Sequence, residues 1–183
     1  TGLLAGLDLV AVTEALGKAF NDNRYISVTW IILPVIGLLE RYGLQQRART
    51  VVEGMRGATM GKLLVAYLAF RQVTAALGMK DIGGHPQAVR PLVAPMAEAA
   101  AIKTHGNLSG DERDQVKAMA AATDNVGLFF GEDIFVAFGA IVLMTTFLRE
   151  AGIDVEPLHV AFWGIPTAVC AFAIHAWRLY RLD

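Results

Sequence analysis

Two short glycine-containing segments have residue types that suit a small anionic ligand, and the first is Gly83-Gly84-His85-Pro86. Its glycines allow the backbone to turn tightly and to approach a ligand closely, and its proline begins a following helix whose first N–H groups are free. We therefore expect Gly83, Gly84 and His85 to bind a substrate at the tip of a helical hairpin. An ordinary glycine–proline turn between two helices explains the same residues equally well.

The second segment runs from Asp124 and Asn125 through Gly127 to Gly131. The Asn125 side chain both donates and accepts hydrogen bonds, and the two glycines permit an unwound stretch of helix. Backbone polar groups that a broken helix frees inside a membrane need other polar groups as partners. We therefore predict that this segment converges with the first one, and that Asp124, Asn125 and Gly127 bind the substrate.

Four charged residues lie inside or beside apolar stretches and have two interpretations each. Glu132 and Asp133 precede an apolar run, where they either serve as ion-coupling or charge-pairing groups or cap the N-terminus of a helix. Arg71 lies in the middle of another apolar stretch. Its guanidinium either binds a substrate carboxylate or neutralises Glu132 or Asp133 from a neighbouring helix. The same two roles are open for Arg90.

Several other chemistries have no motif in this sequence. No set of His, Cys, Asp and Glu residues has the spacing of a zinc site, and there is no nucleophile elbow, phosphate loop or dinucleotide fingerprint. We therefore expect no enzyme and no cofactor or metal, apart from a coupling sodium ion or proton. The net charge of -1 provides no broad basic surface, so we expect no nucleic-acid partner.

The composition is that of a membrane protein. Of the 183 residues, 55% are hydrophobic and 18% are charged, and the mean hydropathy is +0.46. Soluble domains carry about 25% charged residues. The apolar residues also form long uninterrupted stretches. We predict an all-α, polytopic integral membrane protein in which residues 1–183 form a single helical transmembrane domain.

Four apolar stretches are the expected membrane segments. An amphipathic stretch over residues 7–23 precedes them, either as an interfacial helix or as a connector. Thr1 to Gly6 resembles the end of an apolar helix, so we expect the N-terminal helix of the domain to be truncated. The last helix is expected to run from about Pro157 to Arg178. The membrane segments are expected at residues 25–39, 63–79, 134–148 and 157–177.

The basic residues predict which side of the membrane each loop faces. Residues 40–62 and the C-terminal stretch 178–181 are basic, so both are expected in the cytoplasm together with the C-terminus. The short acidic loop over residues 149–156 is then outside, and residues 103–124 are a cytoplasmic connector. Because the Ser-x-x-Glu spacing of a capping box lies in this connector, a helix is expected to begin there and to continue through Met119.

The chain must therefore cross the membrane twice between its two cytoplasmic connections. Residues 63–79 supply one crossing, and residues 82–102 supply the return. The return contains three prolines and Arg90, which exclude a continuous helix facing lipid. Irregular backbone at membrane depth is tolerated only where protein or a water-filled cavity surrounds it. We predict a broken or re-entrant helical hairpin that packs inside the protein.

Six blocks of the sequence closely resemble a bacterial membrane family catalogued as domain-of-unknown-function family 969. Members of that family resemble the smaller subunit of a pyroglutamate (5-oxoproline) transporter. The family is also similar to one half of an ion-transporter-superfamily carrier, which is built from inverted repeats. The blocks extend over Gly2–Gly6, Leu16–Arg24, Leu33–Gly43, Arg71–Gly78, Arg90–Glu98 and Asp124–Asp133.

This resemblance implies a secondary carrier in the bacterial cytoplasmic membrane that transports a small carboxylate, together with a second membrane subunit that forms the other half. It assigns no role to any individual residue. Two other functions remain open at this point. One is a membrane scaffold that stabilises a partner permease without touching the substrate, and the other is a membrane-embedded hydrolase that uses Glu132, Asp133 and His85.

Overall fold

The computed structural model describes residues 2–22, 58–135 and 139–183, together with residues 34–35, 37–38, 41–43, 46–47, 50 and 54. Of the predicted membrane segment at residues 25–39, 11 of 15 residues lie outside the described ones, as do 11 of the 23 residues of the basic connection at residues 40–62. Within the described residues all regular structure is helical and there is no strand. The all-α prediction is confirmed for this part of the chain.

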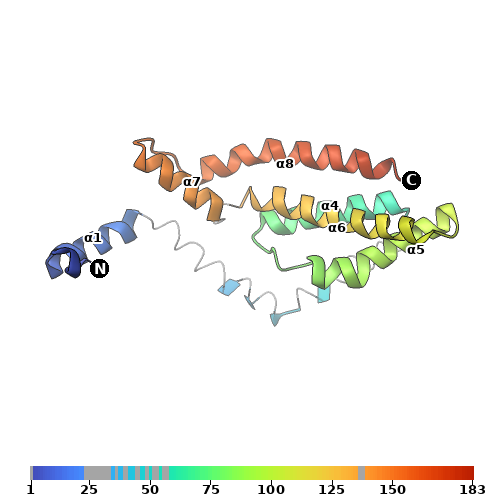
Figure 1. Cartoon of the computed structure of the whole chain (residues 1–183), viewed down its shortest axis with the longest axis horizontal. Helices are drawn as coiled ribbons and strands as arrows, with labels where there is room; N and C mark the ends of the chain where they lie inside the picture. Colours follow the sequence, from blue (N-terminus) through green and yellow to red (C-terminus); the bar gives the residue numbers. More distant parts are fainter. Residues whose placement is uncertain are drawn as a thin grey trace.

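Helices α4 and α6 form the centre of the fold, with α8 along one side and η2 and α5 along the other (Figure 1). Helix α7 precedes α8, and α1 lies at the N-terminal end of the chain. The elements are η1 (Leu3–Ala5), α1 (Leu9–Asp22), α4 (Met60–Ala76), η2 (His85–Val93), α5 (Ala94–His105), α6 (Gly110–Glu132), α7 (Gly139–Glu150) and α8 (Pro157–Tyr180).

Helix α6 is continuous, which corrects the prediction that Gly127 and Gly131 belong to an unwound stretch. These glycines instead allow the backbone of α4 to approach closely. A Cβ at Gly131 would lie 2.5 Å from the carbonyl oxygen of Gln72, and one at Gly127 would lie 3.3 Å from that of Leu68. Small residues have the same role wherever two helices pack at short distance. The two glycines therefore serve packing rather than flexibility.

The predicted capping box is present at the start of α6. The Ser109 hydroxyl accepts a hydrogen bond from the backbone N–H of Glu112, whose carboxylate accepts one from the backbone N–H of Ser109 at 2.8 Å. This second bond lowers the pKa of Glu112 below its ordinary value. The helix continues to Glu132, well beyond the predicted end at Met119, because its second half packs against α4.

We expect Ser109→Ala to lower the thermal midpoint by about 2–4 °C, because it removes one of the two reciprocal bonds at the helix start. Circular dichroism of the purified protein measures this shift. The Glu112 carboxylate contributes stability only above the ordinary glutamate pKa, and this contribution is lost as the pH falls through its lowered pKa. The drop in thermal midpoint that Ser109→Ala causes should therefore be smaller in acid. An equal loss at all pH values would contradict this role of Glu112.

Helix α8 is long and apolar enough to cross a membrane by its length and composition, and it is the one such helix among the described residues. Its 24 residues extend for about 36 Å, which exceeds the roughly 30 Å of a hydrocarbon core. It begins at Pro157, as predicted, and ends at Tyr180, two residues beyond the predicted Arg178.

The fold buries several polar side chains beside its apolar core, and it also exposes many large apolar side chains. Arg71, Thr123, Asp124 and His175 are all buried between helices. The outer face of α8 exposes aliphatic and aromatic side chains, including Trp163 at 73%. The other large exposed side chains of α8 are Leu158, Phe162, Ile165, Val169, Ile174, Trp177 and Tyr180.

The C-terminal residue joins α8 to the start of α4. The Asp183 carboxylate accepts hydrogen bonds from the backbone N–H of Gly61 at 2.7 Å and from the Thr59 hydroxyl. The start of α4, the turn between α5 and α6 and the end of α8 therefore lie at one end of the bundle, and the loop between α7 and α8 lies toward the other (Figure 1).

Candidate functional site

The backbone after α4 turns back and continues as the wide helix η2. Gly83 has a φ of +73°, and a Cβ at this position would lie 2.6 Å from the Phe70 ring, so the turn requires glycine. In η2 the N–H of Val89 bonds to the carbonyl of Gly84 at 3.3 Å, five residues back, which is the pattern of a π-helix. Pro91 inside η2 has no N–H to donate. The predicted break is therefore a turn followed by a π-helix.

A buried ion pair lies beside this turn. The side chains of Arg71 on α4 and Asp124 on α6 are 2% and 4% exposed, and the guanidinium Nε donates to the carboxylate Oδ1 at 2.7 Å. The Tyr67 hydroxyl oxygen lies 2.8 Å from the same carboxylate oxygen and 2.6 Å from the Gly83 carbonyl oxygen. A single hydroxyl hydrogen serves both acceptors, so Tyr67 links the turn to α6.

The same arginine also holds the backbone of the turn. Arg71 Nη1 donates to the carbonyl oxygens of Lys80 at 2.7 Å and Ile82 at 3.1 Å. One of its two expected roles was to neutralise Glu132 or Asp133 from a neighbouring helix, but the acid that faces Arg71 across the α4–α6 contact is Asp124. One guanidinium therefore neutralises a buried carboxylate and satisfies two carbonyls that lie outside any regular helix.

The structure thus brings together three of the residues expected at the site, Gly83, Asp124 and Arg71. Tyr67, which completes this group, was not recognised from the sequence. Its position gave a usable signal, because it lies four residues before Arg71 and so on the same face of α4. We call Tyr67, Arg71, Asp124 and the backbone at residues 80–83 the anchor network.

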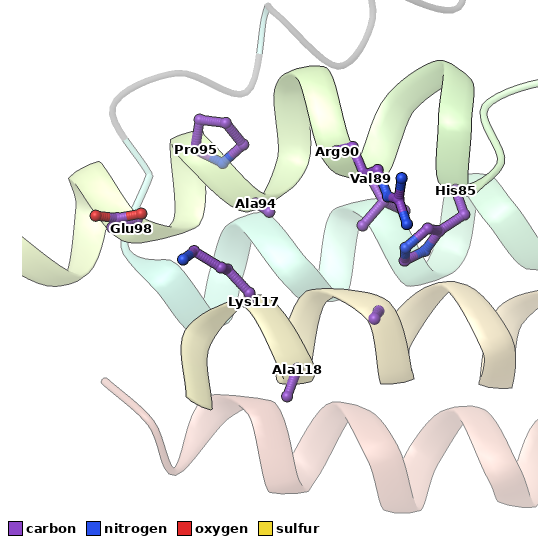
Figure 2. Close-up of a pocket in the computed structure, with 9 residues that line it drawn as sticks. His85, Val89, Arg90, Ala94, Pro95, Glu98, Lys117 and Ala118 are labelled. Carbon is purple, nitrogen blue, oxygen red and sulfur yellow. The ribbon is translucent and has the colours of Figure 1, made fainter. Parts of the chain in front are cut away.

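A cavity of about 410 Å³ opens between η2 and α5 on one side and α6 on the other (Figure 2). His85 and Arg90 project into it at one end, and Glu98 lies toward the other end. The Lys117 side chain extends from α6 into the gap. The remaining lining is mostly apolar and consists of Val89, Ala94, Pro95, Ala118 and Ala121.

The acidic residue of this cavity is already paired. Glu98 Oε1 accepts a hydrogen bond from Arg113 Nη1 at 2.5 Å, and this ion pair joins α5 to α6. Lys117 forms an exposed pair with Asp114 at 3.1 Å, one turn earlier on α6. The Arg90 guanidinium has no hydrogen-bond or ion-pair partner among the described residues. The cavity therefore combines an apolar body with excess positive charge.

The other residues expected at the site lie apart from this cavity. Asn125 is exposed on α6, and Gly127 is buried against Arg71. Glu132 and Asp133 lie at the C-terminal end of α6, not at its start. His85 has no hydrogen bond to either acid in the described part of the chain, which gives the hydrolase interpretation no support.

We expect Gly131→Ala to lower the free energy of unfolding by about 1–3 kcal/mol, because the added Cβ forces α4 and α6 apart. Gly110→Ala is the matched control in the same helix, since a Cβ there meets nothing within 4 Å. It should change stability by less than about 1 kcal/mol. Chemical denaturation of the two variants measures both values. Equal stability of the two would show that the close α4–α6 contact is absent.

A family model described as "Protein of unknown function (DUF969)" matches residues 1–183, which is the whole chain. No curated protein and no solved structure matches the sequence. The match agrees with the family resemblance of the six sequence blocks, and its description states no activity.

Proposed function

We propose that this chain, which belongs to the DUF969 family, is a subunit of a membrane carrier for a small carboxylate. The observation that carries the proposal is the cavity beside η2, where His85, Arg90 and Lys117 lie among apolar residues from η2, α5 and α6. Discontinuous helices at a substrate site are a common feature of secondary carriers. A carboxylate with a compact apolar body matches both the charge and the apolar lining.

The distribution of side chains supports a membrane location. Buried polar side chains and exposed apolar side chains are what a lipid solvent favours, because each polar group in lipid must find a partner inside the protein. The anchor network meets this need for the turn before η2. Helix α8 supplies one span by length and composition, and we propose that the other helices of the bundle complete a polytopic protein.

The ends of the bundle differ in charge in the way that the positive-inside rule requires. The end with the C-terminus carries Lys62, Lys103, Arg113, Arg178 and Arg181. Among the described residues, the opposite end carries fewer basic residues, Lys80 and Arg149, together with the acids Asp81, Glu132, Asp133, Glu150, Asp154 and Glu156. We therefore assign the first end to the cytoplasm of a bacterium.

Cysteine labelling tests this orientation. In a variant whose exposed Cys170 is replaced by serine, single cysteines at Ser109 and Asp154 should react from opposite sides of the membrane. Residue 109 should be reached from the cytoplasm, together with a cysteine at position 47, and residue 154 from outside. Equal labelling of both positions by an impermeant reagent added outside would contradict the orientation.

Pyroglutamate is the proposed substrate because the sequence resembles the smaller subunit of its transporter, and its ring is a compact body with one carboxylate. A second membrane subunit would provide the other half of the carrier. The test is uptake of labelled pyroglutamate by cells that express both subunits, either subunit alone, or neither, with and without a sodium gradient. Uptake that requires both subunits supports the proposal. Full uptake by the partner alone would show that this chain is a scaffold.

A further inference from the structure

The outer face of α8 ends in two arginines beside exposed aromatic side chains. Trp177, Arg178, Tyr180 and Arg181 are all exposed at the C-terminal end of this helix. The Arg181 guanidinium lies over the Trp177 ring, 4.7 Å from its centroid. Residues three and four apart lie on one side of a helix, so Trp177 and both arginines share the face of the exposed Ile174. The basic groups therefore lie directly beyond an apolar surface.

Neither arginine is neutralised within the described part of the chain, where no ion pair involves Arg178 or Arg181. The nearest acid along the chain, Asp183, uses its carboxylate to hold the start of α4. Arg181 stacks on Trp177 through the face of its guanidinium, which leaves the N–H groups at the edge available to an anion. Two exposed cationic side chains can therefore bind the same anion.

The aromatic residues of α8 indicate that lipid covers this face. Trp163 is exposed on the same side as Trp177, fourteen residues or about 21 Å earlier along the helix. Tryptophans near both ends are typical of a helix that faces lipid, because their rings lie at headgroup level. Residues 164–176 include no Asp, Glu, Lys or Arg, and α8 lies along the outside of the bundle (Figure 1). An apolar surface thus leads from one interface to the arginines at the other.

We infer that Arg178 and Arg181 bind the phosphate of an anionic phospholipid, whose acyl chain lies along Ile174 and Trp177. The inference rests on the proposed function only in that this function places α8 in a membrane, and it does not concern the transported substrate. A phosphodiester without a compensating ammonium group matches two unpaired guanidinium groups better than a zwitterionic headgroup does. The site therefore selects anionic lipid over phosphatidylcholine.

Quenching of Trp177 fluorescence by brominated lipid tests this site. The full chain with Trp30→Phe and Trp163→Phe keeps Trp177 as its one tryptophan. It is reconstituted in phosphatidylcholine bilayers that contain increasing fractions of brominated phosphatidylglycerol or brominated phosphatidylcholine. Bromine quenches a tryptophan that it contacts, so the signal reports which lipid lies against Trp177. We expect phosphatidylglycerol to bind about fivefold more tightly or better, with a preference that shrinks as the salt concentration rises.

Variants locate the lipid. Arg178→Gln and Arg181→Gln should each reduce the preference for phosphatidylglycerol several-fold, and the double variant should abolish it. Lys103→Gln, which removes an exposed charge from the last turn of α5, is the matched control and should leave the preference unchanged. A chain that keeps only Trp163 should be quenched equally by both lipids, because no arginine lies within one turn of it on α8. Unchanged circular dichroism confirms that each variant is folded.

The outcomes separate this inference from the proposed function. Equal quenching of Trp177 by the two lipids overturns the anionic-lipid site while the membrane location stands. A preference that survives in the Arg178→Gln, Arg181→Gln double variant overturns the assignment to these residues. If both lipids quench Trp163 and neither quenches Trp177, protein covers this end of α8 and the lipid site is overturned. If neither tryptophan is quenched, the membrane location of α8 is overturned as well.

Discussion

Asp124→Asn should lower the free energy of unfolding by about 3–5 kcal/mol, the largest loss expected from any single substitution outside the apolar core. The side chain keeps its shape and one acceptor oxygen but loses its charge. Arg71, which is 2% exposed, is then buried without a counter-charge. Chemical denaturation in detergent measures the loss, with Asp114→Asn as the control.

The control removes a carboxylate from an exposed pair on the same helix, so it should cost less than about 1 kcal/mol. A double variant, Asp124→Asn with Arg71→Gln, should recover part of the stability, because no unpaired charge remains. If Asp124→Asn is as stable as Asp114→Asn, the Arg71–Asp124 pair does not hold α4 and α6 together.

Tyr67→Phe should reduce pyroglutamate affinity several-fold and cost about 1–3 kcal/mol of stability. The substitution removes only the hydroxyl, which lies 2.6 Å from the Gly83 carbonyl oxygen. That carbonyl loses its side-chain donor, and the start of η2 is less firmly held. His85 and Arg90 are then no longer fixed in the cavity, although Tyr67 does not line it.

Tyr180→Phe removes a hydroxyl from an exposed tyrosine at the end of α8 and is the matched control. It should leave both affinity and stability unchanged. The effects of Tyr67→Phe on affinity and on stability together distinguish a positioning role from a purely structural one. A loss of stability with full affinity would contradict the positioning role of Tyr67 and leave it as a structural residue.

Features that depend on local chemistry were predictable from the sequence. The capping box at Ser109 and Glu112 and the start of α8 at Pro157 follow from side-chain chemistry within one helical turn. The break before η2 follows from closely spaced prolines and the Gly83–Gly84 pair. Each of these signals acts between near neighbours in the chain, so no knowledge of the packing was needed.

Features that depend on which helices face each other could not be predicted in the same way. Gly127 and Gly131 suit both an unwound helix and a close helix contact, and only the position of α4 decides between these. From the sequence, several acids on a neighbouring helix could have faced Arg71. The way in which α4 packs against α6 selects Asp124. Lys117 lies in a stretch that is typical of a solvated connector, and it lines a cavity only because η2 and α5 fold over α6.

Under the proposed function, residues of this chain bind the carboxylate that is transported. The most direct measurement is uptake of labelled pyroglutamate into proteoliposomes that contain both purified subunits, with either the wild-type chain or Arg90→Gln. The two chains should assemble with the partner in equal amounts. We predict saturable uptake with the wild type and its loss with Arg90→Gln at low substrate concentration. Equal uptake by both preparations at every concentration would contradict the claim.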